Sequence, residues 1–109
     1  MGFWSELWEA IKKVWNFLKR VTVKILNFFN NIVNWFKNPE TLAEIRKDLN
    51  NLPVAVKQNL ANGKVTVITG IFNKATGELS VKHTIVYDAE KLDEETAKRF
   101  GDKDLIILK

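Results

Sequence analysis

The chain has 109 residues, a formal net charge of +4 at pH 7 and an isoelectric point near 9.4, and it contains no cysteine. This length allows one small domain, or a domain with an appendage, but not two independent hydrophobic cores. The lack of cysteine excludes disulfide bonds and thiol chemistry, and the charged residues that recur near the N-terminus exclude a spanning helix, which needs about 20 mostly apolar residues.

Residues 3–37 repeat their apolar side chains with a period of seven, which is typical of a long amphipathic helix. With Trp4 as position a of the heptad, Thr22 is the single polar residue at positions a, d and e. Residues 21–23 and the asparagines near position 30 are poor helix formers, and they mark where such a helix would kink. We predict that one apolar face contacts a membrane or a partner: Trp4, Leu7, Trp8, Ile11, Val14, Trp15, Leu18, Val21, Ile25, Phe28, Phe29, Ile32, Trp35 and Phe36.

The whole net charge lies in the same segment. Residues 3–37 hold six basic and two acidic side chains (6 − 2 = +4), whereas the rest of the chain holds eleven of each. All four tryptophans lie there as well. Basic side chains beside an aromatic face suit an anionic membrane surface. The side chains expected to contact anionic headgroups are Lys12, Lys13, Lys19 and Arg20.

A second helix is predicted after the long one. Asn38 is a suitable N-cap residue and Pro39 suits the first turn of a helix, so the first helix should end near Lys37 and the second should reach about Asn50. Residues 54–61 lie between a proline and an Asn-Gly pair, which favours another short helix. Residues 39–63 are therefore predicted to be a short helical connector.

From Lys64 the apolar period changes to two, which is typical of strands. Residues 65–71 and 79–87 read as a β-hairpin in which Gly77 supplies the left-handed turn residue. Asp93 to Gly101 reads as a capped helix, and residues 105–108 form a strand that is apolar on both faces and pairs either within the chain or between chains. Residues 64–109 thus form a ββαβ unit with a three-stranded sheet, and the predicted fold class is α+β, with a long amphipathic helix over residues 1–38.

The apolar face of the long helix would have to be buried against something other than its own chain. It would extend about 52 Å at about 1.5 Å per residue, whereas a compact chain of this length is about 34 Å across. Lipid is one candidate cover, because tryptophan and basic side chains favour the membrane interface. Copies of the chain are another, because a period of 3.5 is typical of helices that wind around one another. Aromatic residues at position e make the apolar face too wide for a dimer.

Residues with catalytic potential are scarce. His83 is the single histidine, and alternation places it near Thr69 on the apolar face of the hairpin, where a structural role is expected. The acidic residues between Asp88 and Glu95 lack the spacing of a calcium loop, and there is no phosphate-binding glycine loop, zinc-ligand set or nucleophile motif. The sequence therefore predicts no enzyme activity, no cofactor and no metal site, and it identifies no small-molecule substrate.

We expect a non-enzymatic, self-associating protein that binds anionic membrane surfaces. The alternative is a structural subunit of a soluble homo-oligomeric or hetero-oligomeric assembly that uses the same helix for packing. Nucleic acid is disfavoured as a partner, because the aromatic and basic residues lie on different faces. We further expect cytoplasmic synthesis without a cleavable signal peptide, and peripheral association with a membrane.

Overall fold

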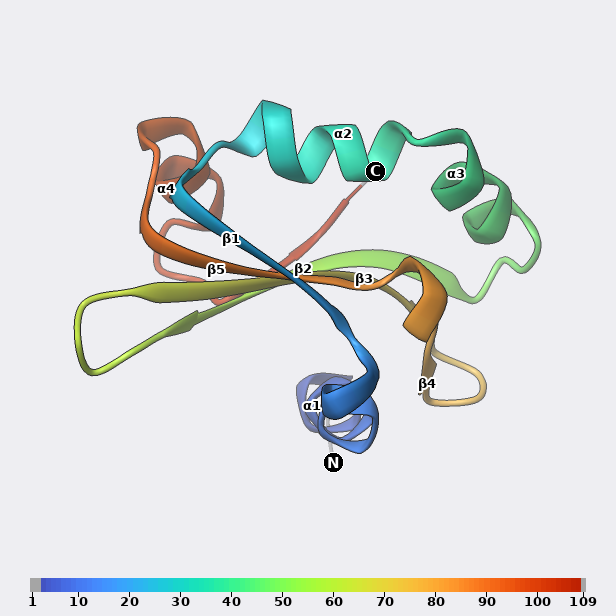
Figure 1. Cartoon of the computed structure of the whole chain (residues 1–109). Coiled ribbons are helices and arrows are strands. Elements are labelled where there is room, and N and C mark those ends of the chain that lie inside the picture. The colour runs from blue at the N-terminus through green and yellow to red at the C-terminus, as the bar shows by residue number, and fades with distance from the viewer. Residues whose placement is uncertain (1–2, 109) are drawn as a thin grey trace.

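The structure, a computed structural model, describes residues 3–108. A mixed β-sheet lies between two helical layers (Figure 1). One layer is α1 (Phe3–Val14), and the other holds α2 (Asn34–Lys37), α3 (Pro39–Arg46) and α4 (Glu94–Phe100). The strands are β1 (Lys19–Leu26), β2 (Asn51–Asn59), β3 (Val65–Asn73), β4 (Glu78–Leu79), β5 (Ile85–Leu92) and β6 (Leu105–Ile107). The predicted α+β class is confirmed, but the sheet has six strands rather than three.

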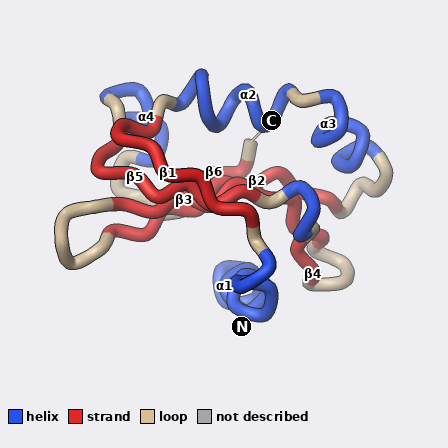
Figure 2. Tube along the Cα trace, viewed as in Figure 1, coloured by secondary structure: helices blue, strands red, loops and turns tan. Residues whose placement is uncertain are grey.

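The sheet takes strands from the whole length of the chain (Figure 2). Its order is β1-β5-β3-β2-β6, and the short β4 pairs with β3 outside this path. β1 and β5 are parallel, with Lys19 opposite Ile85 and Leu26 opposite Leu92, whereas the other pairs are antiparallel. β6 pairs with β2 within the chain and forms one edge, and β1 forms the other.

The predicted continuous helix over residues 3–37 is wrong beyond Val14. After α1 the chain forms a 3₁₀ helix, η1 (Trp15–Phe17), then β1, then a π-helix, η2 (Phe28–Val33), that leads into α2. β1 forms because Val21, Val23 and Ile25 are β-branched and alternate with polar residues, so they suit a pleated, half-buried strand. A heptad pattern and a strand pattern thus overlap in this segment, and pairing with β5 favours the strand.

α1 covers the middle of one sheet face. Leu7, Ala10 and Ile11 lie on one side of the helix at helical spacing, and all three are buried. Phe3 meets Phe72 of β3 edge to face, with ring centroids 5.3 Å apart. We call this cluster the α1-side core; its buried residues are Leu7, Ala10, Ile11, Leu18, Val54, Val56, Ile68, Phe72, Leu79 and Val86.

The opposite sheet face forms a second core beneath η2 and α4. Phe28 and Ile32 of η2 and Phe100 of α4 are buried against side chains of β3 and β5. Alternation along the strands divides neighbouring residues between the two cores, as with Val67 and Ile68. The second core comprises Leu26, Phe28, Ile32, Ala55, Val65, Val67, Tyr87, Ala89 and Phe100.

The predicted short helix over residues 54–61 is also wrong, because β2 occupies Asn51–Asn59. Val54 and Val56 point into the α1-side core and Ala55 into the second core, which is the alternation of a strand buried on both faces. Pro53 lacks a backbone N–H, but its carbonyl oxygen accepts from the Leu108 N–H at 2.8 Å. The proline therefore does not interrupt the ladder between β2 and the C-terminal segment.

The predicted hairpin turn is present, and Gly77 has φ +72°. Its second strand is interrupted, because β4 is followed by a 3₁₀ helix, η3 (Val81–His83), before β5 begins. Thr69 consequently lies opposite Ile85, and the predicted position of His83 beside Thr69 is wrong.

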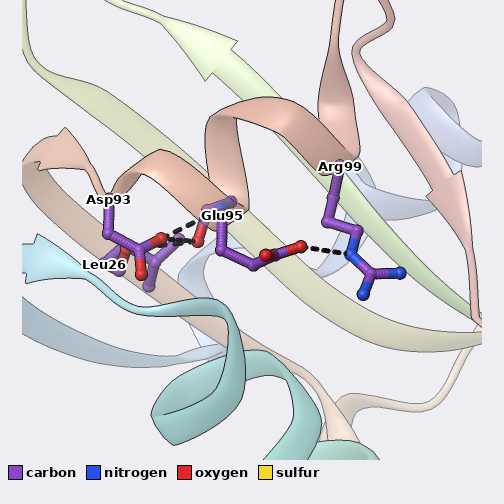
Figure 3. A network of polar contacts seen from close by, with 5 residues as sticks. Leu26, Asp93, Glu95 and Arg99 are labelled. Atoms are coloured by element: carbon purple, nitrogen blue, oxygen red, sulfur yellow. Dashed lines mark hydrogen bonds and ion pairs between the residues drawn. The ribbon is translucent and has the colours of Figure 1, made fainter.

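α4 begins and ends where its sequence predicts. The Asp93 carboxylate accepts from the Thr96 N–H at 2.9 Å and from the Thr96 hydroxyl (Figure 3), and Gly101 follows the last turn with φ +58°. The Asp93 N–H donates to the carbonyl oxygen of Leu26 at 3.0 Å. This bond joins the start of α4 to the end of β1.

Candidate functional site

The predicted apolar face of residues 3–37 is divided between the two sides of the sheet. Six of its side chains are buried: Leu7, Ile11, Leu18, Phe28, Ile32 and Trp35. Five are half-buried: Trp8, Val14, Trp15, Val21 and Phe36. Ile25 and Phe29 are exposed, and the side chain of Trp4 lies outside the described part of the structure. The chain's own sheet covers most of this face, so these residues do not form one continuous surface.

The four predicted headgroup contacts lie on either side of the turn between α1 and β1. Lys12 and Lys13 lie in the last turn of α1, and Lys19 and Arg20 begin β1. All four are exposed. Only residues 14–18 separate the two pairs in the sequence, and we call this segment the α1–β1 connection (residues 12–20).

Phe17 lies in the middle of this connection, and it is 75% exposed, whereas the next residue, Leu18, is 7% exposed. The Leu18 N–H donates to the carbonyl oxygen of Trp15 at 3.4 Å and closes η1. Since Leu18 is anchored in the α1-side core, the tight turn leaves Phe17 outside the core. A large aromatic side chain is therefore held in solvent on a short, anchored turn.

Arg20 is fixed by contacts on two sides. Its guanidinium carbon lies 4.7 Å from the centroid of the Trp15 ring. Its Nε and Nη2 donate to the two carboxylate oxygens of Asp88, at 3.2 and 3.4 Å. Thr66 Oγ1 donates to the same carboxylate at 3.2 Å. These contacts hold Trp15 and the beginning of β1 in one geometry.

The other basic side chains of the α1–β1 connection have a weak ion-pair partner or none among the described residues. Lys12 lies 4.0 Å from Glu9, and both side chains are exposed, so this pair is weak. Within residues 3–108, Lys13 and Lys19 have no ion-pair partner. Their ammonium groups are available to an external anion.

Phe17 was not among the residues predicted from the heptad. It occupies position g, outside the apolar positions a, d and e. A signal was nonetheless present in the sequence, because Phe17 is an aromatic residue off the apolar face with basic residues within five positions on both sides. A residue at position g would lie outside the apolar face of the predicted helix.

A second surface lies on the other side of the sheet, between η2, α2 and β6. It is a mainly apolar groove of about 440 Å³, and we call it the β6 groove. Phe29 and Ile107 are its most exposed apolar residues, at 53% and 43%. Arg99 borders the groove, with its guanidinium carbon 4.9 Å from the Phe28 ring centroid and its Nε 2.7 Å from Glu95 (Figure 3).

The residues considered for catalysis have structural contacts. The Nδ1 atom of His83 lies 3.0 Å from the Ser80 hydroxyl, Asp88 binds Arg20, and Asp93 caps α4. No three His, Asp or Glu side chains in the described residues lie close enough to hold a metal ion.

None of the helices over residues 3–108 combines the length and the hydropathy needed to cross a membrane. The chain matches no protein-family model, and no curated protein or solved structure matches it.

Proposed function

We propose that this chain is a non-enzymatic protein that binds anionic membrane surfaces through the α1–β1 connection. The observation that carries the proposal is Phe17, which is 75% exposed and has four exposed cations within five positions of it in the sequence. The transfer of a phenylalanine side chain from water to an apolar environment is favourable by about 1.5–3 kcal/mol. Lysine and arginine side chains near an anionic bilayer each contribute about 1 kcal/mol. Both contributions come from side chains of the α1–β1 connection.

These magnitudes predict weak binding by a single copy. One phenylalanine and three or four cations amount to about 5–6 kcal/mol, which corresponds to a dissociation constant near 0.1 mM. Two or more linked copies would bind far more tightly, because the second contact is intramolecular. Self-association is therefore part of the proposal. The contact is peripheral, since the bulk of the aromatic face stays in the two cores.

The test compares vesicles of anionic and zwitterionic lipid, with co-sedimentation and tryptophan emission as readouts. We expect binding to anionic vesicles only, with a blue shift from Trp15 beside the inserted Phe17. Phe17→Ser should weaken binding about tenfold. Phe29→Ser is the matched control, because it removes an exposed phenylalanine from the opposite sheet face. Equal affinity of the Phe17→Ser and wild-type proteins for anionic vesicles would contradict the proposal.

The alternative function, a structural subunit of a soluble assembly, is supported by the β6 groove. β6 is an edge strand, and Ile107 and Phe29 leave apolar surface exposed beside it. An edge strand can pair antiparallel with the same strand of a second copy around a two-fold axis. This alternative predicts a dimer by light scattering in lipid-free buffer. Phe29→Glu should convert it to a monomer, whereas Phe17→Ser should leave it intact.

A further inference from the structure

A cavity of about 360 Å³ opens between the layer that holds α2 and α3 and the β1 and β5 side of the sheet. The proposed membrane contact does not use this cavity. Tyr87 and Trp35 are buried at its wall, and Asn30 and Asn34 line it from η2 and α2. Its size is within the range of small-ligand sites. Lys19 belongs both to this cavity and to the α1–β1 connection, so the two features are adjacent.

The π-helix η2 places amide side chains at this cavity. The Asn34 N–H donates to the carbonyl oxygens of Phe29 and Asn31, and the first of these bonds spans the five residues of a π-turn. The Asn31 carbonyl also accepts from the Tyr87 hydroxyl at 3.3 Å. Among the described residues, the Asn30 side chain has no hydrogen-bond partner. It is free to donate to a ligand, and wide π-turns of this kind are frequent at functional sites.

The charges of the cavity favour an anion. Lys19 and Lys82 line it against one carboxylate, Glu40, which gives a net charge of 2 − 1 = +1. Neither lysine has an ion-pair partner within the described range. Ammonium and amide N–H groups are strong donors to phosphate oxygens. Glu40 can accept hydrogen bonds from alcohol hydroxyl groups, which a polyol ester carries beside its phosphate.

We propose that this cavity binds the phosphate ester of a small polyol, with Lys19, Lys82 and Asn30 donating to the phosphate and Glu40 accepting from a hydroxyl. Glycerol phosphate has this chemistry, and it occurs both as a free metabolite and as the headgroup of phosphatidylglycerol. The proposal goes beyond the membrane contact, because a soluble ester can occupy the cavity without a bilayer.

The first part of the test titrates the ¹⁵N-labelled full chain with glycerol 3-phosphate and follows the amide shifts of Asn30 and Lys82. Asn30→Asp should weaken binding about tenfold or more, because it replaces a donor with a carboxylate of the same shape. The fold should tolerate this change, since an acidic residue near a helix N-terminus is favourable. Lys82→Gln should also weaken binding, whereas Lys74→Gln on the β3–β4 turn is the control and should not.

The second part compares vesicles that contain phosphatidylglycerol or phosphatidylserine at equal charge. A preference for phosphatidylglycerol that Asn30→Asp removes supports the cavity site and identifies a lipid source. Saturable binding of glycerol 3-phosphate that Asn30→Asp weakens supports it and identifies a free source. The proposal would be overturned if the protein showed neither a preference for phosphatidylglycerol nor saturable binding of glycerol 3-phosphate. It would also be overturned if Asn30→Asp bound as tightly as wild type. Phe17→Ser separates the two proposals, because it should weaken vesicle binding about tenfold and leave the glycerol 3-phosphate titration unchanged.

Discussion

The indole N–H of Trp35 donates to the carbonyl oxygen of His83 at 2.7 Å. Trp35 belongs to α2 and is 6% exposed, and His83 ends the 3₁₀ helix that precedes β5. The bond therefore ties the helical layer to the beginning of β5, across 48 positions of sequence. Both residues also line the cavity between these elements.

Trp35→Phe should destabilise the fold by about 1 kcal/mol. The variant keeps an aromatic ring but removes the donor to the carbonyl oxygen of the half-buried His83, and a typical intramolecular hydrogen bond contributes about 0.5–1.5 kcal/mol. Urea denaturation followed by circular dichroism measures the change. Trp15→Phe is the control, because its indole is half-buried. Equal destabilisation of the two variants would show that lost volume, rather than the hydrogen bond, is responsible.

Asp93 makes the stability depend on pH. Burial raises the pKa of Asp93, but hydrogen bonds from the Thr96 hydroxyl and amide, and from the amides of Phe28 and Asp93, lower it more, so the net pKa lies below that of an ordinary aspartate. Its stabilising contribution is then complete above about pH 3.9 and is lost as the pH falls through the folded-state pKa. Asp93→Asn retains an N-cap acceptor that does not titrate.

We therefore expect wild type to lose more stability than Asp93→Asn between pH 5 and pH 2, as measured by the urea midpoint. Asp93→Ala should cost about 1 kcal/mol at pH 7, since the N-cap acceptor is removed. Parallel pH profiles for wild type and Asp93→Asn would contradict the role of the carboxylate.

Two glycines are required for different physical reasons. A methyl group at Gly70 would lie 2.8 Å from Thr84 Oγ1 and 3.1 Å from Leu79 Cδ1, so Gly70→Ala should cost about 2 kcal/mol through overpacking. At Gly77 the surroundings are open, and Gly77→Ala should cost about 1 kcal/mol because φ is +72°. Thr84→Ala should reduce the cost of Gly70→Ala but not that of Gly77→Ala. If the stability losses of Thr84→Ala and Gly70→Ala, measured by thermal denaturation, were strictly additive in the double variant, the steric explanation would be disproved.

Arg20→Gln should separate membrane contact from stability. The Arg20–Asp88 pair is partly exposed, so its loss should change the free energy of unfolding by less than about 1 kcal/mol. The same substitution should weaken binding to anionic vesicles about fivefold. Arg99→Gln is matched to it, because Arg99 also pairs with a carboxylate and stacks on an aromatic ring, but on the other sheet face. Equal effects of the two variants on vesicle binding would show that only total charge matters.

The parts of the fold that were predicted from sequence are those specified by local signals. Gly77 fixes the hairpin turn, Asp93 begins α4 and Gly101 ends it, and each of these signals lies within a few residues of the feature that it determines. Asn38 likewise accepts from the Glu40 N–H at the start of α3. Local chemistry decides such positions whatever the rest of the chain does.

The incorrect predictions concern segments whose partners are distant. Val21 and Ile25 fit the spacing of a helix, and with Val23 they also fit the alternation of a strand. The choice depends on β5, which no local pattern identifies as a partner. Phe17 was missed for a different reason: its exposure follows from the turn between α1 and β1, which the heptad interpretation did not contain.

The parallel pairing of β1 with β5 also sets an order of events during synthesis. Lys19 pairs with Ile85, which is made 85 − 19 = 66 residues later. At about 5–20 residues per second, β1 waits roughly 3 to 13 s for the strand that completes its ladder. During that interval the aromatic-rich N-terminal segment is an amphipathic nascent peptide without its sheet. Its apolar side chains therefore have no completed sheet to pack against until β5 has been made.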